Sequence, residues 1–205
     1  MTPLLTGISL GFSAGIGPGP LTTLVISTTL ARGFGAGLLV ALAPLLTDAP
    51  IIVLTLVVIS ALPTAVVTGL AVAGGLYLLF LGGKTAQTAR TAVLATGSAA
   101  PQQRRADLGR GALVNMLNPA PWLFWLSVGG PILTEAWQGP KLAALGFLVG
   151  FYALLVGCKI GLAWVVASGR RFLTDVWYRR LLAGSGLLLA GFGLLLIWQT
   201  MVGKA

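Results

Sequence analysis

Two charged side chains stand inside long apolar segments, where solubility cannot explain them. Asp48 is the one charge between Gly33 and Gly83, and Lys159 is the one charge between Leu142 and Ala167. A charge at bilayer depth costs about 2.5 kcal/mol or more, so such a residue normally faces a partner or a water-filled cavity. We expect Asp48 to carry a proton or to meet an ammonium group, and Lys159 to meet a carboxylate or to keep Asp48 ionised. A structural salt bridge between the two is the alternative.

The composition places these charges in a membrane protein. The chain of 205 residues is 57% hydrophobic and 8% charged, whereas globular domains average about 25% charged residues. A helix that crosses the hydrocarbon core needs roughly 20 apolar residues. We expect an all-α integral membrane protein with six transmembrane helices, at about 4–30, 35–60, 64–83, 112–133, 142–167 and 181–201.

Two of these segments contain residues that interrupt helices. Gly15 to Pro20 holds three glycines and two prolines in six residues, and the fourth segment contains Pro119-Ala120-Pro121. Proline removes a backbone donor and clashes with the preceding turn. We therefore expect helices 1 and 4 to be broken at Pro-x-Pro, with new half-helices beginning near Leu21 and Trp122. The N-terminus of such a half-helix suits a carboxylate. A kink that serves packing alone is the alternative.

The distribution of basic residues predicts the orientation. Cations gather on the cytoplasmic side of membrane proteins. On the other side, the links after the second and fourth spans and the C-terminal end hold only two cations, Lys141 and Lys204. Both termini are therefore expected to be extracytoplasmic. The links after the first, third and fifth spans hold Arg32, Lys84, Arg90, Arg104, Arg105, Arg110, Arg170, Arg171, Arg179 and Arg180.

The chain also contains a weak internal duplication. Pro18 matches Pro119 at an offset of 101 residues, and the stretch from Gly75 matches the stretch from Gly186 at an offset of 111. The second offset leads from Asp48 to Lys159, so the two charges fall on equivalent positions. Three spans per half make an inverted repeat, typical of secondary transporters with a site at the midplane. We expect repeats at 1–83 and 112–205, joined by a cytoplasmic linker loop at 84–111.

Further polar side chains are candidates to line the same site. Asn115 and Asn118 are costly in lipid and should face the interior, where they can bond to freed backbone or to substrate. Thr22 and Thr47 are weaker candidates, because hydroxyls in such spans often bond to their own helix. The expected site comprises Gly17, Pro18, Gly19, Pro20, Thr22, Thr47, Asp48, Asn115, Asn118, Pro119, Pro121 and Lys159.

Scarce residue types argue against several classes of protein. The chain has no histidine, four acidic residues and one cysteine, Cys158, so we expect no metal site, no cofactor and no catalytic residue. The net charge of +9 is concentrated at the ends of apolar segments, which indicates anionic lipid as the partner rather than nucleic acid. Glycine-rich helix faces are compatible with a homodimer.

Several short motifs follow one another in a recognisable order: Gly17-Pro18-Gly19-Pro20, Arg32-Gly33, Gly37, Tyr77 to Gly82, Gly111 and Asn115-Met116-Leu117-Asn118-Pro119. In this set the chain resembles the LysE/RhtB family of amino-acid exporters over essentially its whole length. The resemblance implies an efflux carrier, driven by the proton gradient, for amino acids or related small metabolites. The chain departs from the family at Ala120, where lysine commonly follows Asn-Pro.

We therefore predict a secondary active exporter of small zwitterionic metabolites, working by alternating access and proton antiport in the inner membrane. One alternative is a transporter of a cation, a lipid or a peptide-like compound. Another is a membrane protein with a structural or assembly role and no transport. A membrane enzyme or redox carrier would need nucleophiles, metal ligands or paired cysteines, in which this chain is poor.

Overall fold

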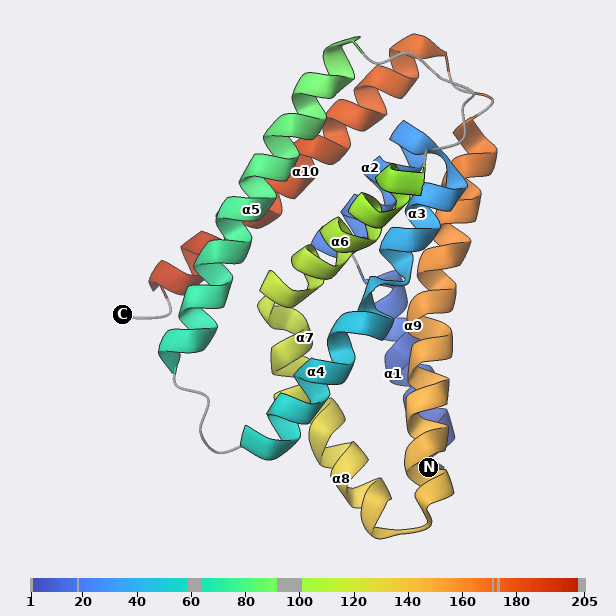
Figure 1. Ribbon diagram of the computed structural model, residues 1–205, viewed down its shortest axis with the longest axis vertical. Helices are drawn as coiled ribbons and strands as arrows, with labels where there is room; N and C mark the ends of the chain where they lie inside the picture. Colours follow the sequence, from blue (N-terminus) through green and yellow to red (C-terminus); the bar gives the residue numbers. More distant parts are fainter. Residues whose placement is uncertain are drawn as a thin grey trace.

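The chain folds into an elongated bundle of helices. The computed structural model describes residues 2–17, 19–58, 64–91, 101–170, 172 and 174–202, and every regular element within these ranges is helical. In Figure 1, α5 (Thr64–Thr91) and α10 (Asp175–Val202) run side by side along one flank, and α9 (Lys141–Arg170) runs along the other. The predicted all-α class is confirmed.

The first apolar segment is broken where the glycines and prolines predict it. α1 (Pro3–Ile16) ends as Gly17 donates its N–H to Ser13 O, and α2 (Pro20–Arg32) begins four residues after the end of α1. Pro20 occupies the first turn of α2, where its missing N–H leaves no bond unmade. Pro18, which is expected to contribute to this break, lies outside the described residues.

The second break differs in position from the prediction. α6 (Pro101–Leu117) ends before Asn118, and α7 (Pro119–Phe124) begins directly after it. The chain is therefore interrupted at Asn118, not within Pro119-Ala120-Pro121, because both prolines fit the first turn of a new helix. The half-helix begins at Pro119 rather than near Trp122. It continues through η1 (Trp125–Gly129), a π-helical turn, into α8 (Gly130–Gln138).

A third break is absent from the sequence prediction. α3 (Phe34–Ala41) and α4 (Ala43–Val58) are separated at Leu42, because Pro44 has no N–H to continue the ladder of hydrogen bonds. The expected linker at 84–111 holds the end of α5 and the start of α6 rather than loop alone.

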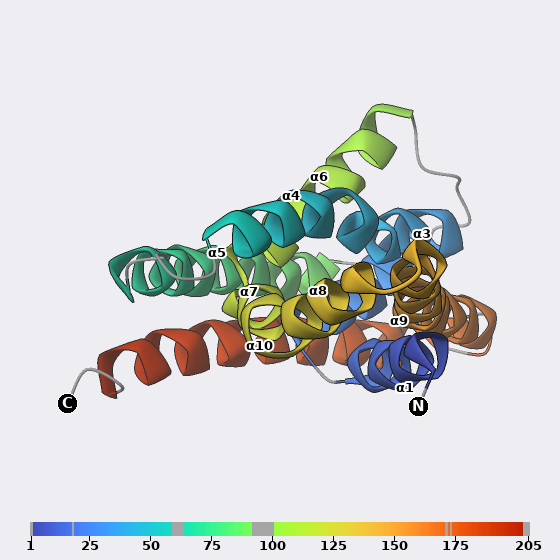
Figure 2. The same cartoon turned by 90° about the horizontal axis from the view of Figure 1, so that it is seen from below.

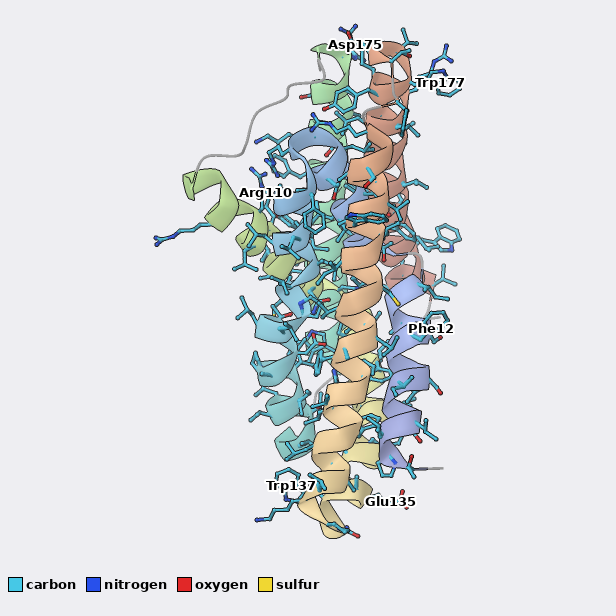
Figure 3. The ribbon with its side chains drawn as sticks, turned by 90° about the vertical axis from the view of Figure 1, so that its right-hand side faces the viewer. Phe12, Arg110, Glu135, Trp137, Asp175 and Trp177 are labelled. Atoms are coloured by element: carbon cyan, nitrogen blue, oxygen red, sulfur yellow. The ribbon has the colours of Figure 1, made fainter. Side chains whose placement is uncertain are left out.

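Long apolar helices are present, as the composition predicts. Among the described residues, three helical stretches are long and apolar enough to cross a membrane, Phe34–Leu56, Lys141–Arg170 and Asp175–Val202, while Pro3–Ile16 is a shorter apolar helix. Large apolar side chains such as Phe12, labelled in Figure 3, and Leu142 are exposed on the outside of the bundle.

α5 and α10 pack antiparallel through two pairs of glycines. A Cβ added at Gly75 would lie 2.8 Å from Gly193 O, and one added at Gly193 would lie 2.6 Å from Gly75 O. Gly82 and Gly186 show the same reciprocal approach, at 2.5 and 2.7 Å. Small residues of this kind allow helix backbones to approach closely in membranes. The internal duplication matches residues 75–82 with residues 186–193, and these four glycines are the first and last residues of the two stretches.

α1 and α9 approach each other equally closely. Gly7 and Gly11 face the carbonyl oxygens of Phe147 and Phe151, where a Cβ could not be placed without displacing the α9 backbone, and Gly15 faces Leu154 and Cys158. Figure 2 shows α1 lying against α9 in this way. The contact brings the C-terminal end of α1 beside the middle of α9, which is the part that carries Lys159.

The α5–α10 contact can be tested with two adjacent glycines. Gly82→Ala should lower the thermal unfolding midpoint of the purified protein in detergent by several degrees, because overpacking costs about 1–3 kcal/mol. Gly83→Ala is the matched control, since no atom lies within 4 Å of its added Cβ, and alanine is the better helix former. Equal midpoints for the two variants would contradict the described packing.

Candidate functional site

A partly open pocket of about 310 Å³ lies where the breaks in the two halves of the chain meet. Nine of the predicted site residues line it, together with apolar residues from α1, α9 and α10. Thr47 and Pro119 lie outside the lining, and Pro18 is outside the described residues. The predicted residues in the lining are Gly17, Gly19, Pro20, Thr22, Asp48, Asn115, Asn118, Pro121 and Lys159.

Asp48 forms one polar wall of the pocket. Its carboxylate accepts hydrogen bonds from Asn115 Nδ2 to Oδ1 at 2.7 Å and from Tyr152 Oη to Oδ2 at 3.2 Å. Asn115 Nδ2 also donates to Thr47 Oγ1 at 2.7 Å, and Thr47 donates to Ala43 O. Three helices, α4, α6 and α9, thus converge on one carboxylate that is 3% exposed.

Lys159 forms a second polar part of the lining, at the break between α1 and α2. Its Nζ donates to Gly15 O at 3.3 Å and to Thr22 Oγ1 at 3.0 Å, and Thr22 donates in turn to Gly17 O at 2.9 Å. Carbonyls in the last turn of a helix lack intrahelical partners. Lys159 therefore satisfies a backbone group that the break sets free, from a position that is 4% exposed.

The two charges share the pocket without forming an ion pair. No contact within 4.0 Å joins Asp48 to Lys159, both of which lie in described helices. The alternative of a structural salt bridge between them is therefore absent from this arrangement. Each charge is held by neutral groups, so an ammonium and a carboxylate of one ligand would both find an opposite charge in the pocket.

Asn118 serves mainly the backbone. Its Oδ1 accepts a hydrogen bond from Ala120 N at 3.1 Å and so caps α7. Trp122 Nε1 donates to Met116 O at 2.9 Å, which satisfies a carbonyl at the end of α6. Since Pro119 and Pro121 carry no N–H, the start of α7 offers fewer donors than expected. The first turn of α2, beside Lys159, holds one proline and so leaves more backbone donors than the first turn of α7.

Aromatic rings make up much of the apolar lining, and they are missing from the site predicted by sequence. Phe124, Trp125, Phe151 and Phe192 line the pocket. Phe124 and Phe151 stack at 5.0 Å between centroids, and Trp125 meets Phe151 edge to face at 5.5 Å. Trp125 Nε1 is buried and lies close to the carboxylate of Asp48.

Tyr152 is a further site residue that sequence reasoning missed. It lies seven residues before Lys159 on α9, a spacing that places both on one helix face. That spacing is the signal that could have found it, since Tyr152 donates directly to Asp48. A polar side chain on the same helix face as a buried lysine is a candidate to belong to the same site.

The side chains that line the pocket suit a small molecule with charged ends. Its volume is near the lower end of the roughly 300–1,000 Å³ found for small-molecule sites. In the described ranges, no cluster of three or more His, Cys, Asp or Glu side chains is placed to hold a metal ion.

Comparison with known proteins gave one match. The sequence profile of the LysE type translocator family matches residues 12–200. No curated protein and no solved structure matched the chain. The matched range includes every residue that lines the pocket.

Access of water to the pocket can be measured by thiol labelling. In a Cys158→Ala background, Ala14→Cys and Ala120→Cys should react with a membrane-impermeant maleimide applied to both faces of the bilayer, because both positions line the pocket and a thiol ionises only in water. Leu46→Cys is the control, since Leu46 is 58% exposed on the outside of α4, two residues from Asp48. Equal reaction at Leu46→Cys would contradict a water-filled pocket.

Proposed function

The chain belongs to the LysE type translocator family, and on that premise we propose that it exports amino acids or similar small zwitterionic metabolites across the inner membrane. The family is one of membrane transporters rather than of enzymes. The observation that carries the proposal is the pair of buried opposite charges, Asp48 and Lys159, that line one pocket.

The geometry favours a zwitterion over a simple cation. The ammonium group of the cargo would bind Asp48, and its carboxylate would bind Lys159 beside the first turn of α2, whose dipole adds to the attraction. The aromatic side chains of Phe124, Trp125 and Phe151 would contact the rest of the molecule. A cation would leave Lys159 as a repulsive neighbour, and the volume of about 310 Å³ is small for a lipid or a longer peptide-like compound.

Asp48 is also the proposed carrier of the coupled proton. It is a carboxylate at bilayer depth, held by the neutral donors Asn115 and Tyr152, and no cation among the described residues pairs with it. Protonation removes the cost of an ionised group in this environment. Exchange of a proton for the ammonium of the cargo at one carboxylate would couple export to the proton gradient, with the gradient in place of any cofactor.

We propose an architecture of two inverted repeats, 1–83 and 112–205, for this mechanism. The reciprocal contacts of Gly75 with Gly193 and of Gly82 with Gly186 support it, because a twofold relation between the halves exchanges the two pairs. The halves would rock about the breaks at residues 17–19 and Asn118 to alternate access. Both termini would then be extracytoplasmic, as the distribution of basic residues predicts.

The alternative of a structural or assembly protein without transport makes a different prediction, because such a protein would have no need for water to reach Asp48. The homodimer prediction depends on glycine-rich faces, but Gly75 and Gly186 are used in the contact of α5 with α10. We therefore assign no dimer interface, and the proposed partners are the cargo and the bilayer.

Transport measurements with charge-removing variants test the function. A thermal-shift screen of amino acids and metabolites identifies a binder, whose counterflow and proton-driven transport are then measured in proteoliposomes. Asp48→Asn should remove the dependence on the proton gradient. Lys159→Gln should weaken binding about ten- to a hundredfold, because a hydrogen bond to a charged group contributes about 1.5–3 kcal/mol.

Glu135→Gln and Lys141→Gln are the matched controls, since each removes one exposed charge outside the pocket. Both should behave like the wild type. Gradient dependence that survives in Asp48→Asn would rule out its role in coupling, and unchanged affinity in Lys159→Gln would rule out the carboxylate site.

A further inference from the structure

A second, separate pocket of about 180 Å³ lies between α2, α5, α6 and α10. It is displaced from the central pocket along α2, since Leu21 and Thr22 line the central pocket and Leu24 lines the second one. Leu21, Leu24, Leu78, Leu81 and Leu189 belong to one buried apolar cluster. Of this cluster, Leu21 lines the central pocket, whereas Leu24 and Leu81 line the second one.

The second pocket is basic. Arg32, Lys84 and Arg110 line it, and no carboxylate is among its described lining residues. It lies toward the end of the molecule at which Arg110 and Asp175 are labelled in Figure 3, opposite Glu135 and Trp137. By the distribution of basic residues this is the predicted cytoplasmic end.

Two of these cations, Arg32 and Arg110, pair with one buried carboxylate. Asp107 is fully buried, and its Oδ1 accepts a hydrogen bond from Arg32 and lies 3.5 Å from Arg110 Nη1. This ion-pair cluster fixes both guanidinium groups at the rim of the cavity. A guanidinium group has five N–H donors and one carboxylate oxygen uses few of them. Arg32 Nε and Asp107 Oδ2 are both buried, and neither has a hydrogen-bond partner among the described groups.

Polar hydroxyl groups and apolar surface complete the lining. Ser27, Thr28, Tyr77 and Thr85 provide hydroxyls, and the ring of Phe80 lies 6.0 Å from Lys84 Nζ. A liquid water molecule takes about 30 Å³, so the cavity has room for a charged head and a few further atoms only. Guanidinium groups match the geometry of carboxylate and phosphate oxygens.

We propose that this second pocket binds one oxyanion group, held between Arg32, Lys84 and Arg110. The group is either the carboxylate of a small acid from the cytoplasm or the phosphate of an anionic lipid, since basic pockets between membrane helices bind lipid head groups. The site is distinct from the central pocket, because the two linings share no residue.

Binding is tested with the full chain in nanodiscs, by the thermal unfolding midpoint. In phosphatidylcholine discs, sodium phosphate and sodium acetate are compared with sodium chloride at equal ionic strength. In a second arm without these anions, phosphatidylglycerol replaces part of the phosphatidylcholine. A gain of several degrees in the first arm identifies a soluble oxyanion, and a gain in the second arm identifies a lipid phosphate.

Lys84→Gln and Arg110→Gln should each lose at least half of that gain. Lys84→Gln leaves both ion pairs of Asp107 in place, so its loss cannot be attributed to their disruption. Arg105→Gln is the control, because Arg105 is exposed on the same helix and does not line the pocket, and it should retain the gain. No gain from any probe, or a gain that persists in Lys84→Gln and Arg110→Gln, would overturn the proposal. Neither result depends on whether the protein transports a cargo.

Discussion

The hydrogen bonds of Lys159 with the ends of α1 and α2 are the interaction on which the central pocket depends. In lipid, a backbone carbonyl must find its partner within the protein. The break after Ile16 sets Gly15 O free, and Lys159 Nζ reaches it from α9. This reach exists because Gly7 and Gly11 allow α1 to lie directly against the α9 backbone. The packing of small residues thus places the charge, and the charge in turn makes the break tolerable.

The second break is stabilised by different means. Asn118 Oδ1 accepts a hydrogen bond from Ala120 N and so caps α7, and Trp122 Nε1 donates to Met116 O. The backbone groups left without helical partners at this break are thus satisfied by neutral side chains of the same segment. Asn115, one turn earlier, remains available to hold Asp48 across the helix contact. The two breaks therefore differ: one is closed locally, whereas the other is closed by a charged group from a different helix. Only a charged partner of that kind can be drawn away by a ligand of opposite charge.

Much of the site is predictable from sequence, because polar residues are rare enough in apolar spans that each one must face inward. This rule alone assigns Asp48, Asn115 and Lys159 to one pocket, and all three line it. It fails where a residue type has two roles. The prolines after Asn118 could end a helix, but here they lie in the first turn of a new one. Pro44 lies two residues after the break at Leu42, which the sequence analysis did not predict. Tyr152 and Trp125 resemble packing aromatics, and the contact of Arg32 with Asp107 joins segments too far apart for any periodicity to show.

The separation of Asp48 from Lys159 has a consequence for any charged ligand of the pocket. A direct ion pair would neutralise both residues, so that neither charge would be available to a ligand. Instead Lys159 is held by a carbonyl at 3.3 Å and a hydroxyl at 3.0 Å, and charge-assisted bonds to a carboxylate are shorter and stronger than these. The ammonium group has three N–H donors, of which two are used here, so a carboxylate can bind the third one. A strong bond to that carboxylate would weaken the bond of Lys159 to Gly15 O. Under the proposed mechanism, ligand binding and the break after Ile16 would therefore be coupled through this one ammonium group.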